Sequence, residues 1–564
     1  MAVKFGATFR FTIVDCSIGK HDTVALANDL KRLNPMFIIF LEGEETRRQS
    51  VFSLCSYWFQ CSVCTTSCTP FIREYVVILL KPTMNADDII KICLPIFIGL
   101  SVRSAISLHS YSGEGKPPMY GDYEAQRHWM EITFNLPPTE WYTNTTENDL
   151  NYWGLDYPPL TAYHSWFMGK LASLINSEWV QLYTSRGYES KEHKLFMRYT
   201  VFIADLLIFI PFVIVYFYSV LPRLVNTDVN RLKQISGFYA ACLMLTYPGI
   251  ILIDHGHFQY NCISLGLYLA SVNCLLLHWD IFASILFCLA LCYKQMELYH
   301  SLPIFFYLLS VCLHKSTLRD SIIHFIKLGL TVLLTISFVF TPFLLTNNAK
   351  GTVYQVVKRL FPLDRGIYED KVSNFWCATS PLVKWRSLFP PSSLSSSSSP
   401  SYELVLISIL LVSITCLPPC CLILLKKSNQ QKKFLTSLVI CSLGFYLFSF
   451  QVHEKSILLV SIPVLCLLPI YPISSFLFTL CSVLSMWPLL KKDQLRLASL
   501  SLFCIYSILG CFIVFRNNNS SSDNNNNHGK HNTDKTLQKT SSSDSSSSSK
   551  NVFTIRLFRY SSWL

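Results

Sequence analysis

Repeated long apolar segments limit most strongly what this chain can fold into. The first convincing one, residues 89–108, has the length that an α-helix needs to cross a bilayer. Hydrophobic residues make up 51% of the chain and charged residues 15%, which is more apolar surface than one soluble core can bury. The sequence therefore predicts an all-α polytopic membrane protein, with further spans at 195–221, 236–253, 259–276, 279–296, 299–313, 321–345, 402–425, 434–450, 456–470, 472–489 and 497–515.

The basic residues predict how these spans are oriented. A net charge of +12 could suggest a nucleic-acid partner, but the bases lie in short clusters between apolar segments, as in cytoplasmic loops, so we expect none. If the loop at about 109–194 lies on the far side of the membrane, alternation places Arg223, Lys315 and the run 426–433 in the cytoplasm. This distribution obeys the positive-inside rule and predicts a cytoplasmic N-terminus.

Two segments bear on this alternation. Residues 159–175 form an amphipathic pattern, and the alternation holds only if they lie at the membrane interface as a helix that does not cross. Lys491 and Lys492 fit the alternation poorly, because it does not place them on the cytoplasmic side.

Polar motifs at the span ends all fall on the far side. The sequon Asn144-Thr145-Thr146 lies there as well, which predicts a lumenal glycosylation site at Asn144. One face thus gathers acids, histidines and cations into a predicted cleft above the bilayer, from Asp122 and Glu124, residues 254–259, residues 294–297, the second loop at about 346–401 and residues 453–455. We therefore expect an active site that faces the lumen.

The stretch that follows the first span is the strongest candidate for chemistry. Asp122 and Glu124 stand two residues apart, with Arg127, His128 and Trp129 close behind. Unpaired acids beside a bilayer are costly unless they have a function. The alternative is a helix N-terminus with acids in its first turn, and the two interpretations are compatible.

Other polar motifs have a structural interpretation beside the functional one. Asp205, inside a span, is either functional or hydrogen-bonded within the bundle. His255 and His257 could bind a metal, but no carboxylate-rich motif completes a ligand set, so hydrogen bonding is favoured. The charged run 359–376 is either a solvated helix face or a phosphate clamp. Four cysteines at 55–68 have one C-x-x-C and no nearby histidine, so we expect thiols and not zinc.

Seven motifs carry a family resemblance. They are GDYEAQRHWMEITFNLP, YWGLDYPPLTAYHS, TSRGYESKEHKLFMR, GHFQYN, YKQMELYH, RLFPLDRGIYEDKVSNFWC and FSFQVHEKSILLVS. They resemble the endoplasmic-reticulum dolichyl-phosphate-glucose-dependent α-1,3-glucosyltransferases, and most closely the members that add the first glucose to the lipid-linked high-mannose oligosaccharide. The resemblance covers about residues 90–515 and implies a GT-C bundle with a lumenal catalytic loop that contains interfacial helices.

The resemblance divides the chain into three parts. Residues 1–88 form an N-terminal extension without an assigned role, and 89–515 form the membrane glucosyltransferase domain. Residues 516–564 include a Ser/Asn tract, whose composition predicts disorder. The family's activity implies an enzyme of the endoplasmic reticulum membrane that transfers glucose from dolichyl phosphate β-glucose to the terminal mannose of the dolichyl-pyrophosphate-linked oligosaccharide. The α-1,3 linkage would form with inversion, as a step of N-glycosylation, and the enzyme would contact membrane lipid and need no cofactor or metal.

The resemblance also implies roles for single residues. Asp122 occupies the position of the family's catalytic acid and would act as the general base. His453, Lys455 and Arg365 are the candidates for binding the leaving phosphate. Glu124, Arg127 and Trp129 would position the sugars, and the remaining substrate-binding candidates are Asp156, Tyr157, His257, Gln259, Lys294, Gln295, Lys371 and Glu454.

Three other functions stay open at this stage. A sister enzyme adds the second glucose, and the stretch RGIYEDKVSNFWC favours the first-glucose member. A transporter or flippase of lipid-linked sugars would carry its ionisable groups at mid-membrane and show internal repeats. An inactive membrane scaffold would not respond to substitution of Asp122.

Overall fold

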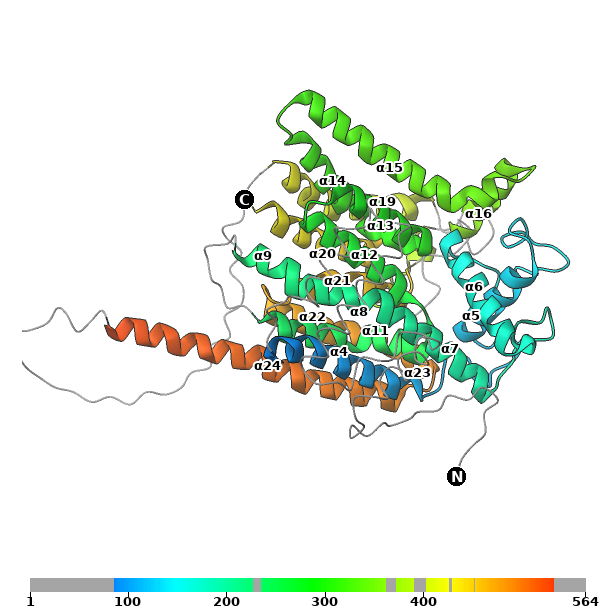
Figure 1. Ribbon diagram of the computed structural model, residues 1–564, viewed down its shortest axis with the longest axis horizontal. Helices are drawn as coiled ribbons and strands as arrows, with labels where there is room; N and C mark the ends of the chain where they lie inside the picture. Colours follow the sequence, from blue (N-terminus) through cyan, green and yellow to red (C-terminus); the bar gives the residue numbers. More distant parts are fainter. Residues whose placement is uncertain are drawn as a thin grey trace, which may run out of the picture. The chain divides into compact units, whose positions relative to one another are not determined.

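The computed structural model describes residues 86–226, 235–361, 372–389, 402–425, 429–450 and 452–531. Within these ranges the regular elements are helices, and no strand occurs (Figure 1). The predicted all-α class is confirmed. The α-helices are α4 (Ala86–Ser107), α5 (Asp122–Asn135), α6 (Pro159–Ile175), α7 (Lys191–Ala204), α8 (Ile210–Val215), α9 (Leu221–Asn226), α10 (Gly237–Leu245), α11 (Pro248–Ile251), α12 (Asn261–Leu276), α13 (Asp280–Tyr293), α14 (Ser301–Leu313), α15 (Leu318–Leu344), α16 (Ala349–Leu360), α17 (Phe375–Thr379), α18 (Trp385–Leu388), α19 (Tyr402–Leu425), α20 (Gln430–Phe448), α21 (Ile457–Cys466), α22 (Pro472–Ser485), α23 (Trp487–Lys492) and α24 (Arg496–His531).

Seven helical segments of the described part are long and apolar enough to cross a bilayer. They are Ala86–Ser107, Lys191–Leu224, Gly237–Phe258, Gln295–Leu313, Leu318–Leu344, Tyr402–Leu425 and Arg496–Phe515. Each matches a span expected from the sequence. The other expected spans are helical too. The α12, α13 and α22 helices are shorter than 18 residues and α21 has 10, whereas the expected span 434–450 lies in α20, which has 19 residues but is not among the seven. The chain is therefore a multi-span membrane protein.

The buried acid in the second span has partners within the bundle. Asp205 starts a π-helical turn, η3 (Asp205–Phe209), and its carboxylate accepts a hydrogen bond from Arg103 of α4. His255 Nε2 lies 2.9 Å from the same carboxylate oxygen, and all three side chains are fully buried. Of the two interpretations of Asp205, the structure supports the second, because its charge is compensated inside the bundle.

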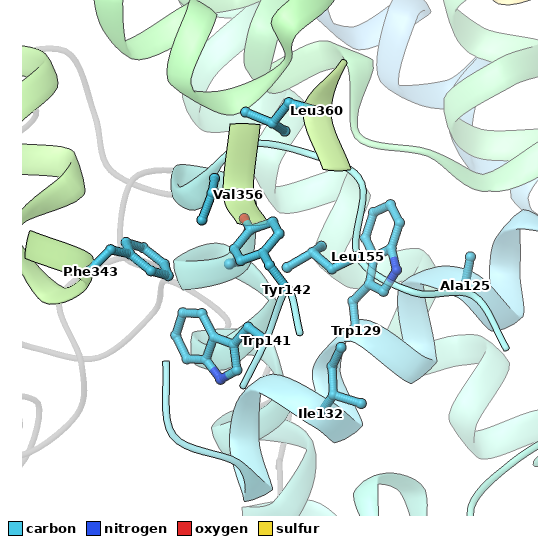
Figure 2. Packing of buried hydrophobic residues seen from close by; sticks show 10 residues of the cluster. Ala125, Trp129, Ile132, Trp141, Tyr142, Leu155, Phe343, Val356 and Leu360 are labelled. Carbon is cyan, nitrogen blue, oxygen red and sulfur yellow. The ribbon is translucent and has the colours of Figure 1, made fainter. Parts of the chain in front are cut away.

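A small apolar core organises the loop that follows α4. Ala125, Trp129 and Ile132 project from one side of α5 toward Trp141, Tyr142 and Leu155, and Phe343, Val356 and Leu360 close the cluster from α15 and α16 (Figure 2). The α6 helix has the predicted bounds, 159–175, and packs against α5. The loop is thus a folded unit with a fixed α5.

Two parts of the sequence analysis lie at or beyond the described ranges. The cysteine cluster at 55–68 lies outside them, as does most of the N-terminal extension. The α24 helix continues from the last span past residue 515 to His531, so the first part of the Ser/Asn-rich tail has helical backbone in the structure.

Candidate active site

A cavity of about 1380 Å³ collects the polar motifs that are far apart in the sequence. Side chains reach it from α5, α16 and α23, and from the junctions before α12, α14 and α21. Ten of the residues predicted for the site line it: Asp122, Trp129, Asp156, Tyr157, Gln259, Lys294, Gln295, His453, Glu454 and Lys455. The predicted cleft is therefore present in the structure.

A close backbone contact sets the position of Asp122. It is the first residue of α5, and the helix-start interpretation of this stretch is confirmed. The preceding Gly121 packs so tightly that a Cβ on it would lie 2.6 Å from the backbone of Ser112. Ser112 in turn donates its backbone N–H to the carbonyl of His257 at 3.0 Å. Glycine at 121 lets the start of α5 dock against the segment that carries His257.

The Asp122 carboxylate is anchored through one oxygen. Oδ2 accepts hydrogen bonds from His257 Nε2 at 3.0 Å, from Gln259 Nε2 at 2.5 Å and from Lys455 Nζ. The other oxygen, Oδ1, accepts no side-chain hydrogen bond in the described part of the chain, and 24% of the side chain is exposed. One oxygen is fixed, and the other is left to meet a substrate in the cavity.

The electrostatics keep this carboxylate ionised. Burial alone would raise the pKa of Asp122, but Lys455 and His257, through their charges and hydrogen bonds, hold it well below its ordinary value. Asp122 is therefore unprotonated throughout the physiological pH range and can accept a proton.

A strained turn brings two hydrogen-bonding side chains to Oδ2 of Asp122. The helix of α11 continues as a π-helical turn, η5 (Leu252–Phe258), and ends at Phe258, whose φ is +89°. Such a φ is unfavourable for a bulky residue and is typically found where function requires it. Because the backbone reverses there, His257 and Gln259 on either side both reach Asp122. Gln259 is held by Lys294, whose Nζ donates to its Oε1 at 3.2 Å.

The C-terminal segment contributes side chains that the sequence analysis did not assign to the site. Lys491, Lys492 and Arg496 line the cavity. The poor fit of Lys491 and Lys492 to the positive-inside pattern was the signal that could have found this segment. Asp493, between them, is buried, and its Oδ2 lies 2.5 Å from Nδ1 of His257. Asp493 itself could not have been found from the sequence, because a lone aspartate forms no motif.

Among the described residues, cations outnumber acids around the cavity. The six lysines and arginines in its lining are Lys294, Arg359, Lys455, Lys491, Lys492 and Arg496, against the acids Asp122, Asp156 and Glu454. Arg359 donates to the carbonyls of Gly154 and Leu155 at 2.8 and 3.2 Å, which ties α16 to the first loop. The lining suits an anionic ligand, and a phosphate group has the charge and oxygens for it.

The predicted positions of Glu124 and Arg127 are corrected by the structure. Both are buried on a different face of α5 from Asp122 and outside the cavity lining. Arg127 bridges Glu124 and Glu131 at 2.6 and 2.7 Å. Burial would raise the pKa of Glu131, but His128 and Arg127 lower it to about 2. The helical spacing separates these residues from the cavity lining and places them in a buried ion-pair network.

His257 also differs from its predicted role. Only 1% of its side chain is exposed, and it lies behind Asp122 and outside the cavity lining. It contacts the Asp122 carboxylate and does not line the cavity.

The aromatic wall of the cavity is formed by several residues. Trp129 is 4% exposed, and its indole donates to the carbonyl of Trp153 at 2.8 Å. Its ring packs edge-on against Tyr157, with centroids 5.1 Å apart. Trp153 and Trp487 also line the cavity and are more exposed, so they offer a sugar more ring surface than Trp129 does.

The remaining predicted residues fall into two groups. Arg365 and Lys371 lie outside the described residues, so their roles stay predictions. Asn144 is exposed on the first loop, and its side-chain oxygen accepts a hydrogen bond from the backbone of Leu150 at 3.1 Å.

Comparisons with known proteins found similar sequences over most of the chain. The model of the ALG6, ALG8 glycosyltransferase family matches residues 89–559. The chain is 50% identical to the dolichyl pyrophosphate Man9GlcNAc2 alpha-1,3-glucosyltransferase of Gallus gallus over 406 residues, 72% of this chain and 75% of that protein. It is 49% identical to the protein of the same name from Rattus norvegicus over 404 residues, again 72% and 75%. A relative described as probable in this activity, from Arabidopsis thaliana, is 42% identical over 422 residues, 74% of each chain.

Proposed function

The chain belongs to the ALG6, ALG8 glycosyltransferase family, and from this membership we propose that it transfers glucose from dolichyl phosphate β-glucose to dolichyl-pyrophosphate-linked Man9GlcNAc2. It is a membrane glycosyltransferase of the GT-C type. The names of its relatives specify Man9GlcNAc2, an acceptor that carries no glucose. This favours the first-glucose reaction over the second. One observation carries the mechanism: an ionised carboxylate with one oxygen left open in a cation-lined cavity.

In the proposed reaction, Asp122 Oδ1 is the general base. The acceptor's mannose hydroxyl attacks the anomeric carbon of glucose from the face opposite to the phosphate. A new C–O bond forms as the bond to the phosphate oxygen breaks, and that oxygen keeps the electron pair. The hydroxyl proton passes to Asp122. A β-linked donor gives an α-linked product, because the single displacement inverts the anomeric carbon.

The leaving group needs stabilisation of charge and no proton. Dolichyl phosphate gains one negative charge as it leaves, and cations placed against it stabilise that charge. His453 lines the cavity and can donate a hydrogen bond to the phosphate. The proposed cationic ligands are Lys455, which contacts Asp122, and Lys491, Lys492 and Arg496 on the C-terminal segment. These cations supply what a metal supplies in other transferases, so we propose a reaction independent of metal.

We propose that the sugars bind to cavity residues other than these cations. Asp156, Tyr157, Gln295 and Trp153 come together there, and Gln295 Nε2 donates to the carbonyl of Asp156 at 3.0 Å. Carboxylate, phenol and amide groups can hydrogen-bond sugar hydroxyls, and an indole can stack on a pyranose face.

The test is a transfer assay with the purified full chain, dolichyl phosphate glucose and two acceptors, Man9GlcNAc2 and its monoglucosylated form, both on dolichyl pyrophosphate. We expect transfer to the first only, an α-1,3 linkage by NMR, and a rate unchanged by a chelator. Transfer only to the glucosylated acceptor would identify the sister activity, and transfer to neither would favour a transporter or scaffold.

The topology gives a separate prediction. We propose that the cavity faces the lumen of the endoplasmic reticulum and that Asn144, exposed on the same loop, is glycosylated. Asn144→Gln should therefore increase mobility on a gel by one glycan, as endoglycosidase treatment of the wild type does. A new sequon placed in the 426–433 run should stay unmodified. An unmodified Asn144 together with glycosylation in that run would reverse the proposed orientation.

A further inference from the structure

The strongest unassigned feature is the contact between Asp493 and His257. Asp493 follows α23, and the next residue, Gln494, has a φ of +62° that turns the chain into α24. The turn is tied to the first loop, because Ser110 Oγ donates to the carbonyl of Asp493 at 3.0 Å and Lys116 Nζ to that of Lys492 at 2.7 Å. A distant segment of the sequence thereby presents a buried carboxylate to the histidine behind the base.

The two hydrogen bonds of His257 fix its protonation. Nε2 lies 3.0 Å from Asp122 Oδ2, and Nδ1 lies 2.5 Å from Asp493 Oδ2. A proton must stand in each of these contacts, since two lone pairs would repel. If Asp122 is to act as a base, it cannot hold one of them. A carboxyl group is ordinarily a stronger acid than an imidazolium, so the proton shared with Asp493 belongs on Nδ1 of the histidine. The histidine then carries a proton on both nitrogens and donates to both carboxylates.

We propose that Asp493 is a positioning residue that keeps His257 as an imidazolium, so that Asp122 is held ionised with Oδ1 open to the acceptor hydroxyl. The proposal rests on the glucosyl transfer inferred above. It gives His257 a role in orienting the base, and it gives the C-terminal segment a part in the reaction.

The charges of the cluster explain why a second carboxylate is needed. Asp122, His257, Asp493 and Lys455 sum to zero before the reaction, with two acids and two cations. When Asp122 takes the hydroxyl proton, His257 stays paired with Asp493, and only Lys455 is left uncompensated. The departing phosphate gains one negative charge at the same time and can pair with Lys455. No proton passes through His257.

Among the described residues, the charged groups in contact with His257 come from three segments. They are Asp122 on α5, Asp493 after α23, and Lys455, whose Nζ lies 3.3 Å from Nε2. Arg198 on α7 donates to the carbonyl of the neighbouring Gly256 at 2.9 Å. Lys455 disfavours a charged imidazole, and both acids favour it. Asp122 loses its charge when it takes the hydroxyl proton, whereas Asp493 does not react. The charge of Asp493 therefore decides whether His257 stays an imidazolium during the reaction.

The test is Asp493→Asn in the full chain. Asparagine can still accept from Nδ1, so the ring stays oriented while the negative charge is lost. We expect kcat to fall roughly 10- to 100-fold, the range known for residues that orient metal ligands from behind, with the KM for both substrates within about twofold. Because His257 then deprotonates more readily, the activity should decline at a lower pH on its alkaline side than in the wild type.

A matched control exists in another carboxylate–histidine pair. Asp280 Oδ2 lies 3.1 Å from Nε2 of His324, between α13 and α15 and outside the cavity lining. Asp280→Asn removes the same charge from the same kind of pair and should leave kcat and its pH profile unchanged. An equal loss in both variants would show a general effect on the bundle and overturn the proposal.

A double-mutant cycle separates this proposal from the proposed function. In an Asp122→Asn background, Asp493→Asn should cost little more, because the group that it serves is gone. Additive losses, or wild-type kcat for Asp493→Asn at every pH, would overturn the role of Asp493 while transfer by the wild type still stands. If Asp493→Asn fails to accumulate, Asp493→Glu decides: it keeps the charge and should retain more kcat than His257→Gln, and equal loss in the two contradicts the proposal.

Discussion

Asp122→Asn is expected to lower glucose transfer by roughly 10²–10⁴-fold, the range typical of general-base loss. Asparagine keeps the size of the side chain, and its amide oxygen can accept some of the three hydrogen bonds made at Oδ2. An amide oxygen is, however, far too weak a base to take the hydroxyl proton. Binding of the donor should persist, because the phosphate is held by cations of the cavity lining. The measurement is single-turnover transfer, with donor affinity determined separately on the same preparation.

The control for this prediction is Asp149→Asn. Asp149 is an exposed acid on the same loop, outside the cavity lining, and its substitution should leave transfer unchanged. Glu124→Gln gives the sharper comparison, because Glu124 belongs to the buried network of Arg127. It should reduce the amount of folded protein more than the turnover of each folded molecule. A larger loss of turnover in Glu124→Gln than in Asp122→Asn would mean that the wrong carboxylate has been named as the base.

Lys455→Met is expected to produce the second-largest loss, roughly 10²–10³-fold in kcat, as for the removal of one donor from a site that stabilises developing charge. Lys455 touches Asp122 and lines the cavity, so it serves both the base and the leaving phosphate. The KM for the donor should rise in the same variant. Lys350→Met, an exposed lysine of α16 outside the lining, is the matched control and should behave as the wild type.

The pH dependence of Lys455→Met follows from the direction of the Asp122 shift. In the folded protein Lys455 and His257 hold the pKa of Asp122 below its ordinary value, against the effect of burial, so the base stays ionised as the pH falls. Removing Lys455 raises that pKa, and the acid limb of the activity profile should move to higher pH. Lys455→Arg keeps the charge and should leave the limb in place. An acid limb at the same pH in Lys455→Met and the wild type would contradict the ion pair as its cause.

Several parts of the site could be predicted without coordinates because they depend on short-range patterns. The start of α5 at Asp122 follows from local sequence, and the positive-inside pattern groups polar span ends on one side of the membrane. Ten predicted residues therefore meet in one cavity. Glu124 and Arg127 lie outside the cavity lining, because residues two and five positions after Asp122 on a helix point in other directions. Only the position of the neighbouring segments decides which direction faces the cavity.

The sequence alone determined the helical membrane class, the spans, the family and the carboxylate proposed as base, since apolar length, charge bias and local motifs are properties of contiguous residues. The tertiary structure decided which groups act on that carboxylate. Asp493 reaches His257 across 236 positions of sequence, and Lys455 reaches Asp122 across 333. Such contacts depend on how the helices pack, and a turn at Phe258 or Gln494 directs them through backbone angles that no residue pattern specifies. The physical reason is that hydrogen bonds act over about 3 Å, whereas sequence patterns record only neighbours along the chain.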